Sequence, residues 1–132
     1  MSTSTVKYLG DLRTEATHLQ SGEKIYTDAP VDNEGKGAAF SPTDLAATSL
    51  ATCMLTIMGI AAKKRNIDIT GTTADVTKVM SANPRQISEI RIDIQFPEHV
   101  AEKDRAILKH VAEHCPVGNS LSADLIETVN FS

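Results

Sequence analysis

The chain has 132 residues, the size of one ordinary domain with a single hydrophobic core. Its formal net charge is -4 and only 13 residues are Lys or Arg, so it lacks the basic excess that is typical of nucleic-acid-binding proteins. The first residues, MSTSTVKYLG, contain no apolar segment of the kind found in a signal peptide. We therefore expect a single domain over residues 1–132 that works in the cytoplasm, without a nucleic-acid partner.

Three short strands are predicted at the start of the chain. The segments TVKYL, RTEATHL and EKIYTD are rich in strand-forming residues, and turn residues at 10–11 and 21–22 separate them. We expect these strands to form an antiparallel sheet. Residues 29–40 contain proline and glycine and few apolar side chains, and this composition predicts a loop.

A long helix of about 22 residues is predicted after this loop. Ser41 is a favourable N-cap, Pro42 suits the first helical position, and Asp44 completes an S-x-x-D start. Apolar side chains lie around most of the helix, so several of its sides must be covered. One sheet of this chain covers only one side, and we therefore expect a homodimer with this helix near its centre.

The uncharged run 45–62 within this helix has about the minimum length of a membrane span. It contains much alanine and no interfacial Trp or Tyr, and it carries the hydroxyl side chains Thr48, Ser49, Thr52 and Thr56. We therefore expect a buried helix and no membrane partner.

Two strands, two helices and a final strand are predicted in the second half of the chain. The strands span 67–80 and 86–96, and the second alternates between charged side chains and the apolar Ile90, Ile92, Ile94 and Phe96. The first helix spans 98–114, with apolar positions at helical spacing: Val100, Ile107, Leu108, Val111 and Ala112. A short helix from Pro116 to about Ser122 and a strand LIETVNF follow. The order β-β-β-α-β-β-α-α-β predicts an α+β fold.

The two cysteines have very different surroundings. Cys115 lies at the expected N-cap of the short helix, where unpaired backbone N–H groups and a protonated His114 would lower the pKa of its thiol. Cys53 lies about three turns inside the long helix, where burial would raise its pKa unless a cation reaches it. Taken alone, these local patterns favour Cys115 as the more reactive thiol, and they favour two structural cysteines over a redox pair.

The segments FSPTDLAATSLATCM and HCPVGNSL, about sixty residues apart, together resemble the OsmC/Ohr family of hydroperoxide-reducing proteins, in particular its OsmC-like branch with an SPTDL helix start. The resemblance covers nearly the whole chain. It implies an OsmC-like fold with a long buried central helix, in an intertwined homodimer. It also implies that Cys53 is the peroxidatic and Cys115 the resolving cysteine of a peroxidase without a cofactor, with an organic hydroperoxide as substrate and a dithiol as reductant.

Two further residues match the family less completely. Arg13 lies about where the family has an arginine that stabilises the thiolate and polarises the peroxide, although an exposed strand charge is the alternative. The family also has a glutamate ten residues before the peroxidatic cysteine, and this chain has Thr43 there. Asp44 either replaces that glutamate or only caps the helix, and capping is favoured because successive helical residues point about 100° apart.

A metal site and a non-enzymatic role are the competing interpretations. His110 and His114 share a helix face next to Cys115, but a fourth ligand is missing and the charges between them indicate a solvated face. The cysteine pair would also suit a redox sensor. A protein that binds a small hydrophobic ligand is a further alternative, with a groove lined by Leu50, Met54 and Met58.

Overall fold

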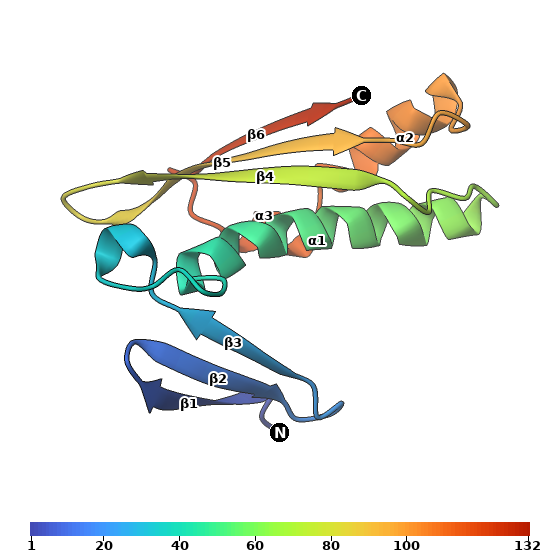
Figure 1. The fold of residues 1–132 in the computed structure, drawn as a ribbon. Helices are drawn as coiled ribbons and strands as arrows, with labels where there is room; N and C mark the ends of the chain where they lie inside the picture. Colours follow the sequence, from blue (N-terminus) through green and yellow to red (C-terminus); the bar gives the residue numbers. More distant parts are fainter. The chain divides into compact units, whose positions relative to one another are not determined.

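A computed structural model describes all residues from Met1 to Ser132. The observed order of strands and helices agrees with the predicted α+β order, and one short 3-10 helix is added in the expected loop (Figure 1). The chain forms two compact units, Met1–Leu45 and Ala46–Ser132. The elements are β1 (Ser4–Gly10), β2 (Arg13–His18), β3 (Lys24–Asp28), η1 (Val31–Asn33), α1 (Pro42–Lys64), β4 (Thr73–Ser81), β5 (Gln86–Gln95), α2 (Glu102–Ala112), α3 (Pro116–Ser120) and β6 (Ile126–Phe131).

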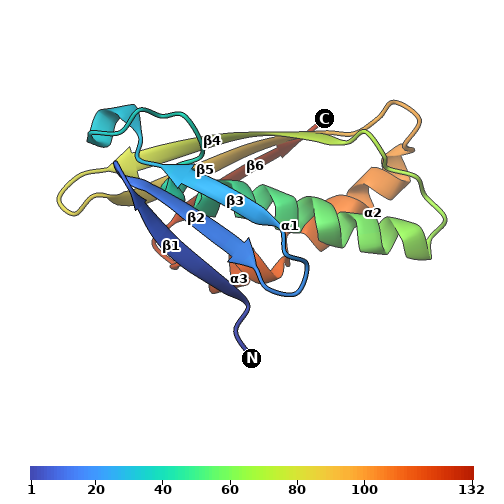
Figure 2. The same ribbon diagram turned by 60° about the horizontal axis from the view of Figure 1, so that its bottom comes forward.

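The first unit contains the predicted antiparallel sheet, with strand order β1-β2-β3 (Figure 2). The turn between β1 and β2 requires positive φ angles at Gly10 (90°), Asp11 (52°) and Leu12 (64°). Glycine adopts such angles without steric cost, and aspartate is among the residues that tolerate them best. This turn brings Arg13 opposite Gly10, and the pairing of β2 with β3 brings the same residue opposite Asp28.

Helix α1 begins with the predicted capping box. The backbone N–H of Asp44 donates to Ser41 Oγ, and the backbone N–H of Ser41 donates to Asp44 Oδ2, each over 3.0 Å. The two contacts satisfy two of the backbone donors that a helix start leaves unpaired. The helix has 23 residues, and Lys63 and Lys64 in its last turn face the negative end of the helix dipole.

The strand predicted from residue 67 begins only at Thr73. Asn66 has a φ of 57° and Gly71 a φ of 96°, and the backbone N–H of Ile67 donates back to Ala62 of the helix. These left-handed residues turn the chain twice before it can extend. Residues 65–72 therefore form a connection, although the apolar Ile67 and Ile69 resemble the start of a strand.

The second unit contains a mixed sheet with the order β4-β5-β6. Strands β4 and β5 are antiparallel, whereas β5 and β6 are parallel. Parallel neighbours need a crossover connection, and here helices α2 and α3 provide it (Figure 1). Helix α3 thus belongs to the connection between two strands that are paired side by side.

The core of this unit lies between α1 and the sheet. The predicted apolar face of β5 is confirmed, since Ile90, Ile92, Ile94 and the following Phe96 are at most 4% exposed. Helix α1 buries one stripe of side chains in the same cluster, and Ile60, outside this stripe, is 52% exposed. The stripe consists of Ala47, Leu50, Ala51, Met54, Met58, Ala61 and Ala62. By length and composition alone α1 is one helix that satisfies the criteria for a membrane span, as the core helix of a soluble protein also does.

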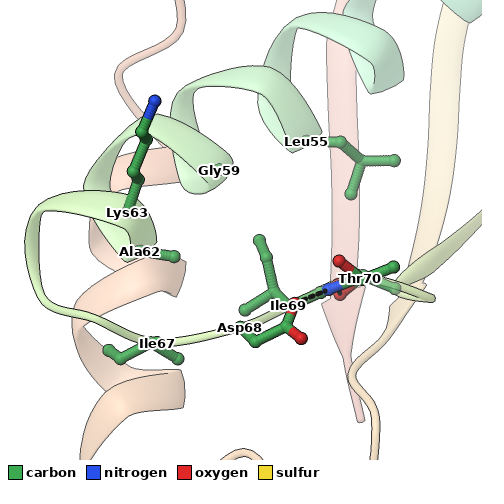
Figure 3. A pocket seen from close by; sticks show the side chains of 9 residues that line it. Leu55, Gly59, Ala62, Lys63, Ile67, Asp68, Ile69 and Thr70 are labelled. Atoms are coloured by element: carbon green, nitrogen blue, oxygen red, sulfur yellow. Dashed lines mark hydrogen bonds between the residues drawn. The ribbon is translucent and has the colours of Figure 1, made fainter.

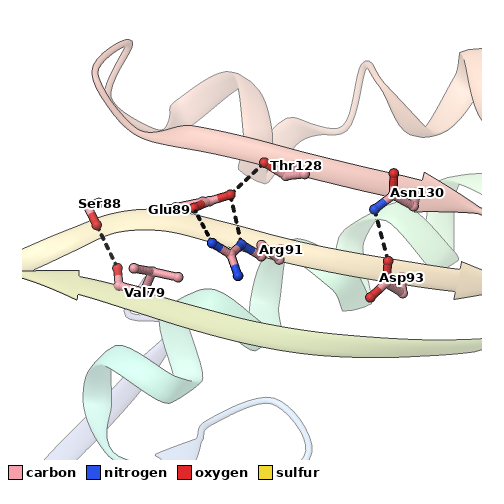
Figure 4. A network of polar contacts seen from close by, with 7 residues as sticks. All are labelled: Val79, Ser88, Glu89, Arg91, Asp93, Thr128 and Asn130. Atoms are coloured by element: carbon pink, nitrogen blue, oxygen red, sulfur yellow. Dashed lines mark hydrogen bonds and ion pairs between the residues drawn. The ribbon is translucent and has the colours of Figure 1, made fainter.

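The outer face of the sheet is polar. The Arg91 guanidinium donates two hydrogen bonds to the Glu89 carboxylate, and Thr128 of β6 donates a third (Figure 4). These contacts hold the pKa of Glu89 below its usual value, chiefly through Arg91. Asn130 donates to Asp93 in the same way across the β5–β6 pair. Thr128 and Asn130 therefore mark the outward register of β6.

Helix α2 begins at Glu102, four residues later than expected. The Arg105 guanidinium donates to the carbonyl oxygens of Val100 (2.8 Å) and Pro97 (3.0 Å), which holds the preceding segment outside the helix. The helix buries Leu108 and Ala112, whereas Ile107, predicted as a core position, is 37% exposed. The apolar residues of α2 follow the predicted helical spacing, but fewer of them are buried than the sequence indicated.

Replacing Ile92 by alanine is expected to destabilise the fold by about 2–5 kcal/mol, because it deletes fully buried methyl and methylene groups. The matched change Ile126→Ala, at a side chain that is 58% exposed in the same sheet, should cost less than about 1 kcal/mol. Denaturant unfolding at one fixed protein concentration measures both. Equal losses of stability would contradict the assignment of the core.

Candidate functional site

Cys115 is the N-cap of α3, as the sequence predicted. Its backbone is extended (φ -77°, ψ 145°), Pro116 occupies the first helical turn, and the backbone N–H of Gly118 donates to Cys115 Sγ over 3.3 Å. The residue is only 1% exposed. A thiol therefore takes the place of the oxygen that usually caps a helix, and it is held in one orientation.

Cys53 lies on α1 and meets Cys115. It is half-buried at the edge of the core, and its thiol is close enough to interact with the Cys115 thiol. Both cysteines are free thiols. Two cysteines about sixty residues apart thus form one dithiol site, which can give up two electrons by forming a disulfide.

The pKa of Cys115 differs from the local prediction. Burial raises it, and the neighbouring Cys53 and the negative charge of Glu127 raise it further, while the Gly118 N–H opposes them. His114, expected to supply a cation, uses its ring Nδ1 to donate to the His110 carbonyl over 2.9 Å. The prediction that Cys115 has a lowered pKa is therefore wrong, because burial outweighs the helix start.

Glu127 is a charged residue of this site that the sequence reasoning missed. Its Oε1 lies 3.4 Å from the position that a Cβ on Gly118 would occupy, and Cys115 Sγ lies 3.2 Å from the same position. The residue is exposed, yet partial burial raises the pKa of its carboxyl group. The signal was present in LIETVNF, where Glu127 shares a register with Leu125, Val129 and Phe131, which all pack on the core.

Arg13 is half-buried in β2 rather than a fully exposed strand charge. Its Nε is buried and has no hydrogen-bond partner. Asp28, opposite it in the register, is 1% exposed; its Oδ2 accepts from the backbone N–H of Ala38, and its Oδ1 is buried without a partner. The role of Arg13 towards Cys53 stays a prediction.

Asp44 has the capping role that the sequence favoured. Its Oδ2 accepts from the Ser41 backbone, and the hydroxyl groups of Ser41 and Thr43 lie 3.2 Å apart. A second role of Asp44, in orienting Arg13, stays a prediction.

The three residues predicted to line a groove along α1 do not line one. Leu50, Met54 and Met58 are at most 3% exposed and belong to the core instead. An open hollow of about 560 Å³ lies over a different side of α1 and reaches Pro116, next to Cys115. Its walls are apolar with basic and histidine side chains at the margin: Ile57, Ile60, Ala61, Lys64, Arg65, His110, Val111, His114 and Pro116.

A second pocket, of about 350 Å³, lies where α1 ends (Figure 3). Its ionisable residues are Lys63 and Asp68, and Lys63 points away from Asp68. The Asp68 carboxylate accepts from the Thr70 backbone N–H, and its pKa is lowered by hydrogen bonds from Thr70. This carboxylate stabilises a turn, and no cysteine or histidine lines the pocket.

His110 of α2 and His114, just after its end, come close to each other. The His110 and His114 rings lie 4.9 Å apart, tilted by 55°, and no group of three or more His, Cys, Asp or Glu side chains is arranged to hold an ion.

Comparisons with known proteins agree with the resemblance seen in the sequence. Residues 35–128 match the family described as OsmC-like protein. A solved structure from Psychrobacter arcticus, provisionally named as an osmotic stress induced and detoxification response protein, is 57% identical, with a TM-score of 0.96 over 100% of this chain and 96% of that chain. None of the curated proteins compared with the chain matches it.

Two more distant structures share the fold. An organic hydroperoxide resistance protein OsmC from Legionella pneumophila is 18% identical, with a TM-score of 0.76 over 100% of this chain and 98% of that chain. The organic hydroperoxide resistance protein OhrB of Bacillus subtilis is 16% identical, with a TM-score of 0.70 over 99% and 98% of the two chains. The predicted OsmC-like α+β fold is thus confirmed.

In a Cys53→Ser variant, the thiol of Cys115 is expected to ionise at a higher pH in the folded protein than after unfolding. Burial remains in this variant and disfavours the thiolate, so the folded pKa stays above the unfolded one. Ultraviolet absorbance of the thiolate, followed against pH with and without denaturant, measures the difference. A lower pKa in the folded state would contradict this assignment.

Proposed function

Because the chain belongs to the OsmC-like protein family, we propose that it is a thiol-dependent peroxidase that reduces organic hydroperoxides. The observation that carries the proposal is the meeting of Cys53 and Cys115 at one site. The fold shared with the organic hydroperoxide resistance proteins of Legionella pneumophila and Bacillus subtilis supports the same substrate class.

The proposed reaction has two steps. The Cys53 thiolate attacks one peroxide oxygen, the O–O bond breaks, and the alkoxide leaves as an alcohol after taking a proton, so that Cys53 becomes a sulfenic acid. The Cys115 thiol then loses its proton and attacks the Cys53 sulfur; the S–S bond forms and the S–O bond breaks with release of water. An external dithiol reduces the disulfide and completes the cycle.

The unequal exposure of the two thiols supports this division of roles. Cys53 is half-buried, whereas Cys115 is 1% exposed and its pKa is raised. A thiol that stays protonated in the resting protein is a weak first nucleophile, but it needs to react only with a neighbour. The apolar hollow that ends at Pro116 suits the organic part of a hydroperoxide.

Arg13 is proposed to supply the cation that Cys53 lacks within its own helix. Its guanidinium carries a planar set of N–H donors, and its Nε has no hydrogen-bond partner within the chain. Such a group is available to stabilise a thiolate and to polarise a peroxide oxygen.

We also propose that the chain forms a homodimer and works in a reducing compartment such as the cytoplasm. The sheet of β1–β3 exposes Val6 (66%), Tyr8 (64%) and Ile25 (49%), and Ile60 of α1 is 52% exposed. A second subunit would remove these apolar side chains from water. The compartment would supply the dithiol reductant.

A redox sensor is the alternative. Thr43 stands where the resemblance places a glutamate, and the neighbouring Asp44 is used in the capping box. If the arginine is poorly oriented for this reason, the cysteines would react once with a peroxide without efficient turnover. The number of peroxide equivalents consumed per subunit distinguishes the two functions.

One equivalent of an alkyl hydroperoxide is expected to convert both thiols of each chain to an intramolecular disulfide. The Cys115→Ser variant should trap a sulfenic acid on Cys53, and Cys53→Ser should not react, because it lacks the attacking thiol. Thiol titration and intact mass measure these states. Unchanged cysteines after excess peroxide would rule out the peroxidase, and consumption of only one equivalent in the presence of a dithiol would indicate the sensor.

Replacing Arg13 by alanine is expected to slow sulfenic acid formation at neutral pH by about tenfold or more, since a neighbouring opposite charge shifts a pKa by roughly 1–3 units. Arg13→Lys should recover part of the rate, because it retains the charge but not the planar fork. The matched control is Arg91→Ala on the outer face of β5. Rapid-mixing kinetics of the Cys115→Ser background isolate this step, and equal rates for Arg13→Ala and the control would exclude the role of Arg13.

A further inference from the structure

Glu127 lies in the register of β6 that points to the core side of the sheet, but at an exposed position near the start of the strand. Its neighbours Thr128 and Asn130 form the outward contacts of β6. Side chains alternate along a strand, so Glu127 lies on the other face, in register with Val129 and Phe131. Those two residues pack against the hydrophobic core. Glu127 is therefore an exposed charged residue in an otherwise apolar register.

The carboxyl group instead lies next to the Cys115 thiol. The absence of a side chain at Gly118 leaves a small space that both Cys115 Sγ (3.2 Å) and Glu127 Oε1 (3.4 Å) border. Leu50 of α1 closes the same space at 3.5 Å. The thiol and the carboxyl group therefore border one small space, and the negative charge of Glu127 acts on the thiol, so that a proton can pass between them through a bridging water molecule.

We propose that Glu127 accepts the proton of the Cys115 thiol when this thiol attacks the sulfenic acid on Cys53. This inference rests on the peroxidase function proposed above and assigns a residue to its second step. Glu127 is the proton acceptor of disulfide formation, and it has no part in the first attack on the peroxide.

With this proton transfer, every bond and proton of the second step is accounted for. The Cys115 S–H bond breaks and its proton moves to the Glu127 carboxylate, while the sulfur electron pair forms the S–S bond. The S–O bond of the Cys53 sulfenic acid breaks, and its oxygen leaves as hydroxide. The proton held by Glu127 then combines with this hydroxide to form water, which restores the carboxylate.

The directions in which the pKa values of Glu127 and Cys115 are shifted favour this proton transfer. Burial raises the pKa of Glu127, which makes its carboxylate a stronger base than an ordinary glutamate. Burial and neighbouring negative charge also raise the pKa of Cys115, so that its thiol needs a base at the moment of attack. A stronger base close to a weak acid is the arrangement in which general base catalysis is most effective.

The Glu127→Gln variant tests the proposal, because a purely electrostatic effect of Glu127 and a role as proton acceptor predict opposite changes in the rate of disulfide formation. Removing a negative charge that raises the pKa of Cys115 would populate its thiolate and accelerate disulfide formation. Removing the proton acceptor slows the same step, and we expect about a 100-fold loss, the lower end of what a positioned base contributes. A rate equal to or above that of the wild type would overturn the proposal.

The two steps are measured separately after mixing with one equivalent of tert-butyl hydroperoxide. Quenching with dimedone followed by intact mass reports the sulfenic acid, and thiol titration reports the disulfide. In Glu127→Gln the sulfenic acid is expected to form at the rate of the wild type and to accumulate. Glu127→Asp, which retains a carboxylate, should recover part of the second step. Slowing of both steps by Glu127→Gln would instead indicate a structural role and overturn the proposal.

A matched control and the wild type separate this inference from the peroxidase proposal. Glu98→Gln makes the same change at an exposed residue before α2 and should leave both steps unchanged. If the wild-type protein itself forms no sulfenic acid, the peroxidase proposal fails and the role of Glu127 fails with it. If the wild type completes both steps and Glu127→Gln does too at the same rates, only the role of Glu127 is refuted.

Discussion

The burial of one stripe of α1 against the isoleucine face of β5 is the constraint on which the rest of the second unit depends. It fixes the rotation of the helix about its axis, because Leu50, Met54 and Met58 must all lie inside. Cys53, one position before Met54, is consequently held at the edge of the core, half-buried. The same packing that stabilises the fold thus determines which thiol a small molecule can approach.

The parallel pairing of β5 with β6 brings the second thiol to this edge. A parallel pair cannot be joined by a tight turn, so the chain must cross over through α2 and α3. Cys115 sits where this crossover restarts as α3, and its sulfur is held by the Gly118 N–H. The crossover therefore positions one thiol, and the packing of α1 positions the other, although the two cysteines are far apart in the sequence.

Patterns with local physical causes were predictable from the sequence, and features that depend on packing were not. The alternation around Ile92 and the capping box of Ser41 and Asp44 need only local geometry, and both are confirmed. The late start of α2 depends on the contacts of Arg105 with two carbonyl groups, which no periodicity reveals. The raised pKa of Cys115 likewise follows from burial that only the folded chain produces.

The position of Glu127 follows partly from a local sequence pattern and partly from the packing of the folded chain. Its inward register could be read from LIETVNF, but the thiol beside it comes from another part of the chain. The residue is exposed, yet partial burial of its carboxyl group raises the pKa and so disfavours the charged form. Its neighbours in this register, Leu125, Val129 and Phe131, are apolar and pack on the core. The observation that points to chemistry is therefore the place of this carboxyl group, beside the same small space that the buried Cys115 thiol borders.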